Sequence, residues 1–551
     1  MSQRSFSTAQ TVDFVIVGSG AAGGVLAKEL ATAGFSVVVL EQGPWRTAKD
    51  FRHDELGNWF LMDLAGAPSE FPQTFRASEN ETAIQPQDGV PPLIYARGVG
   101  GSSVHFTANF WRFHDTDFRE RSLLGPISGT SFADWPIGYA ELEPYYTKVD
   151  WEIGVSGTPG PFDPPRSRPY PVPPLPVKSS GVLLERGAKK LGLHAQPAPM
   201  AILSKTHDGR PPCMHCGYCM MYGCEFDAKS STLATVIPKA VATGKCEVRP
   251  DSTVFRVETD AAGRATGVLY WDRAGAEQRQ QARAVVLAAN GAETTRLLLM
   301  SETTRFRQGL ANSSGMLGKN LMFNGQTAAY GYFEHPLNEY KSVQVTRIIH
   351  DFYDSDPKRG FYGGGGIDAR MSAGPMLFSL FGLPPDAPTW GPEYKRMIRD
   401  YVTRTVEIAG HTTSLPLESN TITLDPTVKD KWGRPALRVT YRDHPDDIKT
   451  MKFMQDRSKE LLRAAGAKRI WALPVGPTTV AAHLLGTARM GTDPHTSVVD
   501  KYHRSHDVRN LFICDGSSFV TSGRGQPTMT IQALAFRAGE HIAAAAKRGE
   551  I

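Results

Sequence analysis

Apolar and polar positions follow two different periods along this chain, and the pattern predicts an α/β protein. Residues 12–17 form a short, β-branched apolar run typical of a buried strand, and residues 36–40 form a second one. Between them, residues 24–33 carry apolar side chains at helical spacing, and Gly34 follows where a left-handed residue ends many helices. A strand, a helix and a second strand in this order predict a β-α-β unit.

The patterning elsewhere predicts further elements of both kinds. Residues 283–289 form another apolar strand that leads into a helix near 293–300, and residues 511–517 contain a strand that ends in an acid. A long helix is expected from about residue 527 to 548. In contrast, residues 157–178 include nine prolines among 22 positions, which predicts an extended surface excursion.

The composition is that of an ordinary globular protein, and it excludes several classes. Of the 551 residues, 41% are hydrophobic and 21% are charged, which argues against global disorder and against a disulfide scaffold. The net charge of +5 is small, and the sequence contains no long cluster of Lys and Arg. The charge pattern therefore gives no reason to expect a nucleic-acid partner. The chain contains no apolar run of about 18 residues, so no transmembrane helix is predicted. Because residues 1–10 lack the apolar core of an export signal, we expect a cytoplasmic location, or a periplasmic one only if the protein is exported with a partner.

The first chemical signal is the glycine-rich loop between the first strand and the first helix. Residues 18–23 read Gly-Ser-Gly-Ala-Ala-Gly, and Glu41, at the end of the second strand, lies 21 positions after Gly20. Glycines let the backbone approach a pyrophosphate, and the helix N-terminus offers free N–H groups to it. A carboxylate about 20 residues further on accepts the hydroxyls of a ribose. This arrangement predicts FAD or NAD, and Glu41 disfavours the 2′-phosphate of NADP.

Two more segments supply candidate cofactor contacts. Residues 95–106 form a Gly/Ser-rich loop suited to line a flat or anionic ligand, although taken alone the loop is equally compatible with a structural turn. Near the C-terminus, Pro527 stands at the start of the last predicted helix, where proline is well tolerated and leaves N–H groups free. A second helix N-terminus is therefore available to an electron-rich ring or an anion.

Together these segments resemble the glucose–methanol–choline (GMC) oxidoreductases. The resemblance spans nearly the whole chain in the right order, and it rests on residues 18–23, Glu41, residues 97–105, 290–293 and 318–321, and the stretch from His483 to Ile531. It implies an α/β fold, in which a Rossmann-like FAD-binding domain carries an inserted antiparallel-sheet substrate domain, as in the architecture of p-hydroxybenzoate hydroxylase. The cofactor-binding residues that it implies are Gly18, Gly20, Ala21, Ala22, Gly23, Glu41, Arg97, Gly100, Gly101, Ser102, His105, Asn290, Asp515, Gly516, Pro527 and Thr528.

The resemblance also implies a division of the chain into domains. The expected parts are a discontinuous FAD-binding domain (11–112, 225–325 and 474–551), a Pro-rich and Cys-rich insertion (113–224) and a substrate-binding domain (326–473). Residues 421–424 and 436–441 read as strands flanking a turn at 430–433. We expect these two strands in the antiparallel sheet of the substrate domain.

Two residues are candidates for the chemistry itself. By its neighbours alone, His483 reads as a packed histidine in an apolar stretch, but it begins a His-x-x-Gly-Thr-x-x-Met-Gly segment whose histidine faces the flavin in the family. The resemblance therefore implies that His483 is the general base, a role suited to imidazole near neutral pH. Before the last helix the family usually has His or Asn, whereas this chain has Gln526. Its amide can hydrogen-bond a substrate oxygen but exchanges no proton, so either a substrate contact or a structural capping role is open.

The role of His105 has three alternatives under the resemblance. In several family members a histidine after the Gly-Gly-x-Ser segment is covalently joined to the 8α-methyl carbon of the flavin, and in others it contacts FAD without a bond. An unrelated structural role is the third alternative. The sequence does not choose among them.

Four of the six cysteines, Cys213, Cys216, Cys219 and Cys224, lie within twelve positions. Their spacing is close to a ferredoxin run but one residue longer before the last cysteine, and no proline follows. An iron–sulfur cluster, present in some multi-subunit sugar dehydrogenases of the family, and a zinc site are alternatives. We favour the third alternative, which is no metal and either reduced thiols or one disulfide.

The resemblance implies an FAD-dependent enzyme that oxidises a CH–OH group of a sugar, glycoside or other alcohol, with proton removal by His483 and hydride transfer to flavin N5. Oxygen, a quinone or an electron-transfer partner is the expected acceptor, and the sequence does not separate an oxidase from a dehydrogenase. A nonredox flavoprotein on the same scaffold, such as a lyase or a flavin-bound structural subunit, is the competing hypothesis. The only feature of the sequence that supports this competing hypothesis is Gln526, where the family usually has His or Asn.

Overall fold

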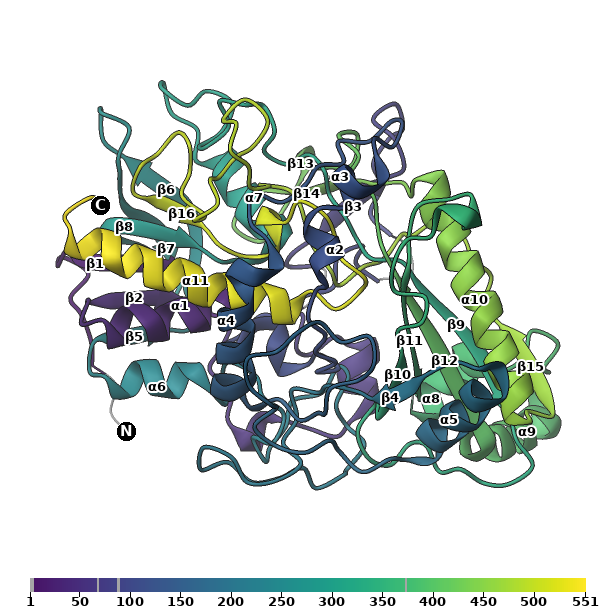
Figure 1. Cartoon of the computed structure of the whole chain (residues 1–551). Coiled ribbons are helices and arrows are strands. Elements are labelled where there is room, and N and C mark those ends of the chain that lie inside the picture. Colours follow the sequence, from purple (N-terminus) through teal and green to yellow (C-terminus); the bar gives the residue numbers. More distant parts are fainter. Residues whose placement is uncertain (1–3, 67–68, 87–89, 372–373) are drawn as a thin grey trace.

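The computed structural model of the chain describes residues 4–66, 69–86, 90–371 and 374–551. Two lobes lie side by side, each built on one large sheet (Figure 1). One lobe carries β1, β2, β5 and β8 with helices α1 and α11, and the other carries β9 to β12 with α5 and α10. Among the described residues, no helix is both long and apolar enough to cross a bilayer.

The first lobe contains a seven-stranded sheet that forms because its central strands are continuous apolar runs. β1 pairs in parallel with β2 and β8, and β16 pairs in parallel with the end of β8. Parallel strands buried on both faces need such runs, and β2 and β16 are buried along their whole length. The strands, in sheet order, are β5 (Cys246–Arg249), β2 (Val37–Leu40), β1 (Val12–Val17), β8 (Glu277–Leu287), β7 (Ala265–Trp271) and β6 (Thr253–Thr259), with β16 (Leu511–Ile513) beside β8.

Helix α11 (Thr528–Lys547) packs against α1 (Ala21–Thr32) and α4 (Tyr139–Val149). Its contact with α1 is close because Gly539 faces Glu29, where an added Cβ would lie 2.8 Å from the Glu29 Cβ. The other helices of this lobe are α6 (Val236–Ala242) and α7 (Asn290–Met300). Helices α2 (Asp115–Phe118) and α3 (Glu120–Leu124) lie between the two lobes and contact Tyr353 and Tyr362 of the second. The predicted first helix is confirmed, with Gly34 in the left-handed region at φ +99° after its end.

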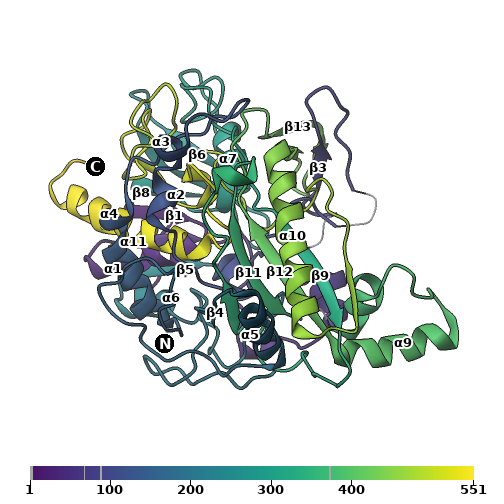
Figure 2. The same ribbon diagram turned by 45° about the vertical axis from the view of Figure 1, so that its right-hand side comes forward.

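The second lobe contains a six-stranded antiparallel sheet covered by helices on one face. Figure 2 shows α10 (Pro445–Ala465) lying along the sheet, and it packs on β9 and β12. The strand order is β15 (Arg469–Ala472), β9 (Gln326–Tyr332), β12 (Thr405–Thr412), β11 (Gly365–Arg370), β10 (Arg347–Ile349) and β4 (Ala195–Pro197). The other helices of this lobe are α5 (Ser179–Leu191), α8 (Pro375–Leu377) and α9 (Gly391–Arg404).

Two segments depart from the expected arrangement. The expectation that residues 421–424 and 436–441 belong to the substrate-domain sheet is wrong, because β13 (Thr421–Lys429) and β14 (Pro435–Thr440) form a separate sheet with β3 (Gln73–Arg76). Their buried side chains join a core that includes Leu93 and Phe323, away from the six-stranded sheet. In addition, β4 and α5, which come from residues 113–224, are part of the second lobe.

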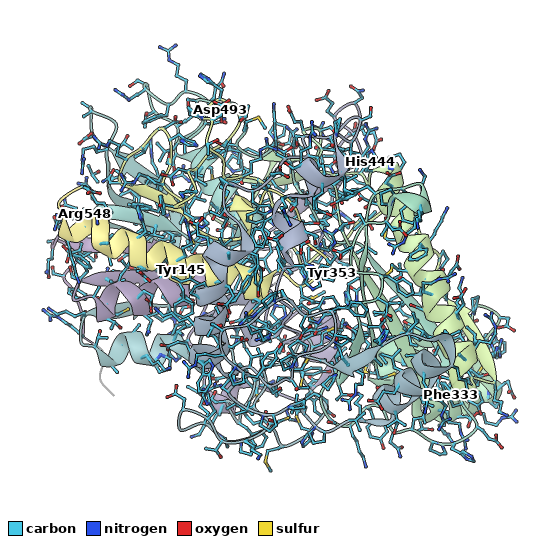
Figure 3. All side chains as sticks on the ribbon, viewed as in Figure 1. Tyr145, Phe333, Tyr353, His444, Asp493 and Arg548 are labelled. Atoms are coloured by element: carbon cyan, nitrogen blue, oxygen red, sulfur yellow. The ribbon has the colours of Figure 1, made fainter. Side chains whose placement is uncertain are left out.

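The Pro-rich stretch has the predicted extended form, but it is not wholly a surface segment, because Tyr170 and Leu175 are buried in the main core. Residues 157–178 contain no helix or strand, and their one ladder contact is a bridge from Val172 to Ser156. Side chains fill the space between the two lobes, where Tyr353 lies (Figure 3). The Tyr353 hydroxyl donates to the buried Asp117 carboxylate at 2.7 Å. This hydrogen bond joins the loop after β10 to α2.

Candidate active site

A cavity of about 410 Å³ lies where the two lobes meet. Gly18, Gly20 and Asn290 line it from the first lobe, and Arg370 and His411 line it from the six-stranded sheet. Parallel α/β sheets commonly bind ligands at the carboxyl ends of their strands. The cavity opens there, immediately after β1.

The glycine-rich loop is shaped both by contacts inside the protein and by the cavity. Gly18 has φ +93°, and a Cβ on it would lie 2.5 Å from the Ala288 carbonyl oxygen, while one on Gly23 would lie 2.0 Å from the Gly18 carbonyl oxygen. Only glycine fits these two positions without a shift of the backbone. A Cβ on Gly20, in contrast, meets nothing closer than 3.8 Å, although Gly20 lines the cavity. Gly18 and Gly23 therefore close the turn, whereas Gly20 leaves room for a ligand.

Glu41 is buried at the end of β2 and organises the loops around it. Its carboxylate accepts from the Ser19 backbone N–H at 3.0 Å and from the N–H groups of Gly43 and Gly98 at 3.2 Å. Burial nevertheless raises the pKa of Glu41, and these hydrogen bonds act against that rise. The carboxylate borders the cavity, where the hydroxyls of a ribose are the expected donors.

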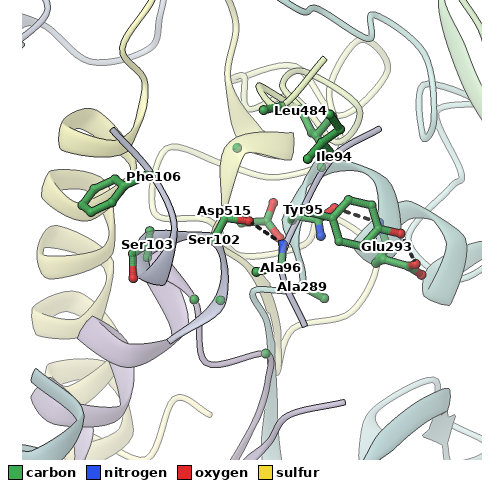
Figure 4. Close-up of a pocket in the computed structure, with 18 of the residues that line it drawn as sticks. Ile94, Tyr95, Ala96, Ser102, Ser103, Phe106, Ala289, Glu293, Leu484 and Asp515 are labelled. Atoms are coloured by element: carbon green, nitrogen blue, oxygen red, sulfur yellow. Dashed lines mark hydrogen bonds between the residues drawn. The ribbon is translucent and has the colours of Figure 1, made fainter. Parts of the chain in front are cut away.

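The second glycine-rich loop lies directly against the first. Gly101 has φ +54°, and a Cβ on it would lie 2.7 Å from the Gly20 Cα. The Gly100 N–H donates to Ser19 Oγ at 3.0 Å, and the Ala96 N–H donates to Ser102 Oγ at 3.0 Å (Figure 4). Together the two loops form one wall of the cavity.

Asp515 and Asn290 complete this wall at the ends of β16 and β8. Asp515 accepts from Thr294 Oγ1 at 2.6 Å and from the Ser517 N–H at 2.9 Å, and burial raises its pKa. The Asn290 side chain accepts from the Ala292 and Glu293 N–H groups at the start of α7. In Figure 4, Asp515 lies beside Ser102, and Tyr95 points to Glu293.

His105 borders the cavity from the second glycine-rich loop. Its side chain is buried, and its Nε2 has no hydrogen-bond partner among the described residues. Burial lowers the pKa of His105 to about 4, with a smaller effect from nearby Lys229, so the imidazole is neutral at physiological pH. A buried, unpartnered ring nitrogen facing a cavity is a site for a ligand contact.

The cysteine-containing loop packs behind His105. The Met221 N–H donates to the His105 carbonyl oxygen at 2.7 Å, and Lys229 Nζ donates to the carbonyl oxygens of Cys219 and Tyr222. All six cysteines are free thiols, and burial raises the pKa of Cys219 to about 12. Across the part of the chain that the structure describes, no three His, Cys, Asp or Glu side chains are grouped so as to bind a metal ion.

His483 also lines the cavity, and its tautomer follows from its neighbour Asn324. The Asn324 Nδ2 lies 3.1–3.3 Å from three backbone carbonyl oxygens, those of Thr412, Ser522 and Gly523. These acceptors fix the nitrogen of the amide on their side, so Oδ1 faces His483 Nδ1 at 3.1 Å. His483 Nδ1 therefore carries the hydrogen, and its Nε2 keeps a free lone pair. Burial and, to a lesser degree, nearby His411 lower the pKa of His483 to about 4.

Gln526 lies beside His411, a residue that the sequence pattern did not single out. Gln526 Nε2 is 3.4 Å from His411 Nδ1, and the His411 ring contacts Asp368 through Nε2 at 2.8 Å. The loop that carries Gln526 is anchored by Arg524, which is fully buried and pairs with Asp117 at 2.8 Å and with Glu120. No sequence signal marks His411 or Asp368, because their strands also carry other polar residues, such as Glu407 in β12 and Arg370 in β11.

Most of the residues predicted from the sequence come together at this cavity. Those that line it are Gly18, Gly20, Ala21, Ala22, Glu41, Gly101, Ser102, His105, Asn290, His483, Asp515, Gly516, Gln526, Pro527 and Thr528. Gly23, Arg97 and Gly100 do not line it and instead support the wall. Arg97 is buried, donates to the Ala65 carbonyl oxygen at 3.0 Å and lies over the Phe71 ring.

The residues that line the cavity fit FAD. Gly20 leaves open space at the start of α1, Glu41 offers a buried carboxylate, and His105, which also lines the cavity, has an Nε2 without a partner among the described residues. The N-termini of α1 and α11 both lie at the cavity, so free N–H groups are available at two places. These features suit a pyrophosphate, a ribose and a flavin ring in one extended ligand.

Comparisons with known proteins agree with this assignment. Two family models described as GMC oxidoreductase match residues 12–324 and 416–535. The chain is 33% identical to 2-methyl-1,2-propanediol dehydrogenase of Mycolicibacterium austroafricanum, over 97% of this chain and 96% of that protein. It is 31% identical to the fructose dehydrogenase large subunit of Gluconobacter japonicus, over 98% and 99% of the two chains.

Among solved structures, pyridoxine 4-oxidase from Mesorbium loti shares the fold, with a TM-score of 0.66 and 18% identity. The match covers 96% of this chain and 98% of that one. The predicted Rossmann-like FAD-binding fold with an inserted antiparallel sheet is confirmed. The chain belongs to the GMC oxidoreductases, a family of FAD-dependent enzymes that act on CH–OH donors.

Proposed function

We propose that this protein oxidises the CH–OH group of an alcohol or a sugar, with His483 as the general base. The observation that carries the proposal is the tautomer of His483. Asn324 accepts from Nδ1, so Nε2 keeps the lone pair that a base requires, at the wall of the cavity. The lowered pKa of His483 keeps the ring neutral, and hence able to accept a proton, at neutral pH.

The residues of the cavity have separate tasks in this proposal. His483 accepts the hydroxyl proton at Nε2, and Asn324 positions the ring. Gln526, which lines the same cavity, contacts the substrate through its amide. Residues of the two glycine-rich loops, with Glu41, Asn290 and Asp515, hold FAD. When bound there, FAD would supply the redox chemistry, as the acceptor for the hydride of the carbinol carbon.

His105 is proposed to contact the flavin. The neutral imidazole with a free Nε2 supports either a covalent bond or a van der Waals contact. Acid denaturation separates the two: a covalent flavin stays with the precipitated protein and raises its intact mass by one FAD, whereas a noncovalent flavin remains in the supernatant.

The electron acceptor is proposed to be oxygen, a quinone or an electron-transfer partner. The named relatives support both modes, since one is a dehydrogenase and a fold neighbour is an oxidase. Stopped-flow reoxidation of the reduced enzyme by oxygen and by a soluble quinone decides among them.

The test of the proposed function is anaerobic mixing of the yellow enzyme with a panel of sugars, glycosides, diols and benzylic alcohols. Loss of the flavin absorbance near its visible maximum with at least one of them is the expected result. A folded, FAD-loaded enzyme that no alcohol or sugar reduces would contradict the proposal and favour a nonredox flavoprotein.

A further inference from the structure

The carboxylate of Asp368, on β11, is surrounded by donors. Arg370 Nε donates to its Oδ1 at 2.6 Å, Arg370 Nη2 also pairs with it, and Asn109 Nδ2 donates to Oδ2 at 3.1 Å. Although burial alone would raise it, the pKa of Asp368 is lowered to about 2 by Arg370 and His411. Asp368 is therefore an ionised carboxylate that only accepts hydrogen bonds.

This fixes the tautomer of His411, on the neighbouring strand β12. His411 Nε2 is 2.8 Å from Asp368 Oδ2, a separation that requires a hydrogen between the two atoms. Asp368 has none to give, so Nε2 carries it. Arg370 Nη2 also lies 2.9 Å from the same nitrogen, and one of its two hydrogens is donated to Asp368. Donation of the other to Nε2 would leave Nε2 and the Asp368 carboxylate as two acceptors 2.8 Å apart with no hydrogen between them, so the Asp368 contact decides the tautomer. Burial lowers the pKa of His411, so the ring is neutral and its Nδ1 holds a lone pair.

The lone pair on His411 Nδ1 in turn orients Gln526. The nearest Gln526 atom is Nε2 at 3.4 Å, and an amide nitrogen can only donate. With the NH₂ end turned to His411, the other end of the amide, Oε1, is the one left for the cavity that Gln526 lines. A carbonyl oxygen accepts and cannot donate.

Two acceptors consequently face the substrate: Nε2 of His483 and Oε1 of Gln526. A single hydroxyl has one hydrogen, and in the proposed reaction His483 receives it. We propose that Asp368 and His411 position the Gln526 amide so that its Oε1 binds a second hydroxyl of the substrate, which makes the site selective for vicinal diols and polyols over monoalcohols. This inference rests on the proposed function, and it makes His411 and Asp368 positioning residues that act through Gln526.

The test compares substrates that differ by one hydroxyl. The pairs are 1,2-propanediol with 1-propanol, and 1-phenyl-1,2-ethanediol with 2-phenylethanol, each measured as kcat/KM and as the anaerobic rate of flavin reduction. The wild type is expected to prefer the diol by roughly tenfold or more, the size of effect that one additional hydrogen bond supplies. Equal values for diol and monoalcohol would overturn the inference while leaving the proposed function intact. If no alcohol reduced the flavin, the proposed function would fail first.

Variants then test the route through Gln526. His411→Leu and Gln526→Leu should each lower the diol preference to near one, and the double variant should lower it no further, because both changes remove the same contact. Asp368→Asn keeps the volume and should lower the preference in the same direction. Additive losses in the double variant, or an unchanged preference in Asp368→Asn, would overturn the positioning role.

His350→Leu is the matched control. His350 is buried beside the same Trp111 ring as His411, at ring distances of 4.6 and 5.6 Å, but it has no hydrogen-bond partner among the described residues and does not line the cavity. It should retain the diol preference even if stability falls. FAD content and thermal unfolding of every variant separate a loss of structure from a loss of selectivity. An equal loss of preference in His350→Leu and His411→Leu would show that packing alone is responsible.

Discussion

The two walls of the cavity are built in different ways. The nucleotide wall consists of two continuous loops, residues 18–23 and 97–105, which meet where Gly101 lies against Gly20. Apart from Gly20, which borders the cavity, their glycines leave no space for a Cβ. The second wall takes single polar residues, His483, Gln526 and His411, from separate segments, and each is held by a hydrogen bond, His483 by that with Asn324. We infer that the first wall is sensitive to the size of a side chain, whereas the second is sensitive to its polarity.

The largest effects are expected from added size at the first wall. Gly23→Val would place its Cβ 2.0 Å from the Gly18 carbonyl oxygen and should prevent folding, so little soluble protein is expected. Gly20→Val meets no protein atom closer than 3.8 Å for its Cβ and should fold as an apoprotein without FAD. Absorbance at the flavin band and circular dichroism distinguish the two outcomes. A yellow Gly20→Val protein would contradict the placement of the cofactor.

Loss of polarity at the second wall should spare the cofactor. His483→Ala should bind FAD as the wild type does and lose turnover by roughly 10²–10⁴-fold, the usual contribution of a positioned acid–base group. Single-turnover flavin reduction measures this directly. A reduction rate close to that of the wild type would remove His483 from the role of base.

A smaller effect is expected at Asn324, which acts through His483. Asn324→Leu keeps the approximate size of the side chain but removes the acceptor for His483 Nδ1–H, so kcat should fall by about tenfold, the effect of one hydrogen bond. Combined with His483→Ala, the same change should add nothing, because the ring that it positions is absent. An additive loss would indicate a structural role instead.

Acid should destabilise the protein through histidines that lie outside both walls. Burial lowers the pKa of His350 and of His503 to about 3, so each stays neutral in the folded state at a pH where the unfolded chain, with a value near 6.5, binds a proton. The free energy of unfolding should therefore fall as the pH drops from about 6.5 towards 3, by roughly 1.4 kcal/mol per pH unit for each histidine. Urea unfolding at several pH values measures the slope.

His503→Gln should make that slope shallower. The same substitution at exposed His194 is the matched control, and the slope should then equal that of the wild type. Equal slopes in all three proteins would show that His503 does not titrate in this way.

The smallest effect is expected in the cysteine loop behind His105. We expect no bound metal there, so Cys216→Ser should change turnover by less than about twofold, within the range of most surface substitutions. Elemental analysis of anaerobically purified enzyme should find neither iron nor zinc in a fixed ratio to FAD. Stoichiometric iron or zinc that is lost in Cys216→Ser would contradict this expectation.

The sequence by itself determined the wall that is made of local motifs. The strand, the glycine-rich loop, the helix, the second strand and Glu41 follow one another within about 30 residues. In such a β-α-β unit the glycines lie at the N-terminus of the unit's own helix, so no contact distant in sequence is needed to form the site. The same holds for Gly34 after α1 and for the extended form of the proline-rich stretch. His483 and Gln526 were identified through the resemblance of their segments to the GMC oxidoreductases. The two family models confirm that the chain belongs to this family.

Only the tertiary structure decided how the polar residues of the second wall are combined. Asn324, Asp368, His411 and Gln526 are far apart in the chain, and their hydrogen bonds arise from the antiparallel pairing of β11 with β12 and from the packing of both lobes. The same reason explains the misplaced strands: β13 and β14 alternate like any half-buried pair, and their pattern carries no information about which sheet they join. Period and composition specify an element and its buried face, but the partner of that face is chosen by long-range packing.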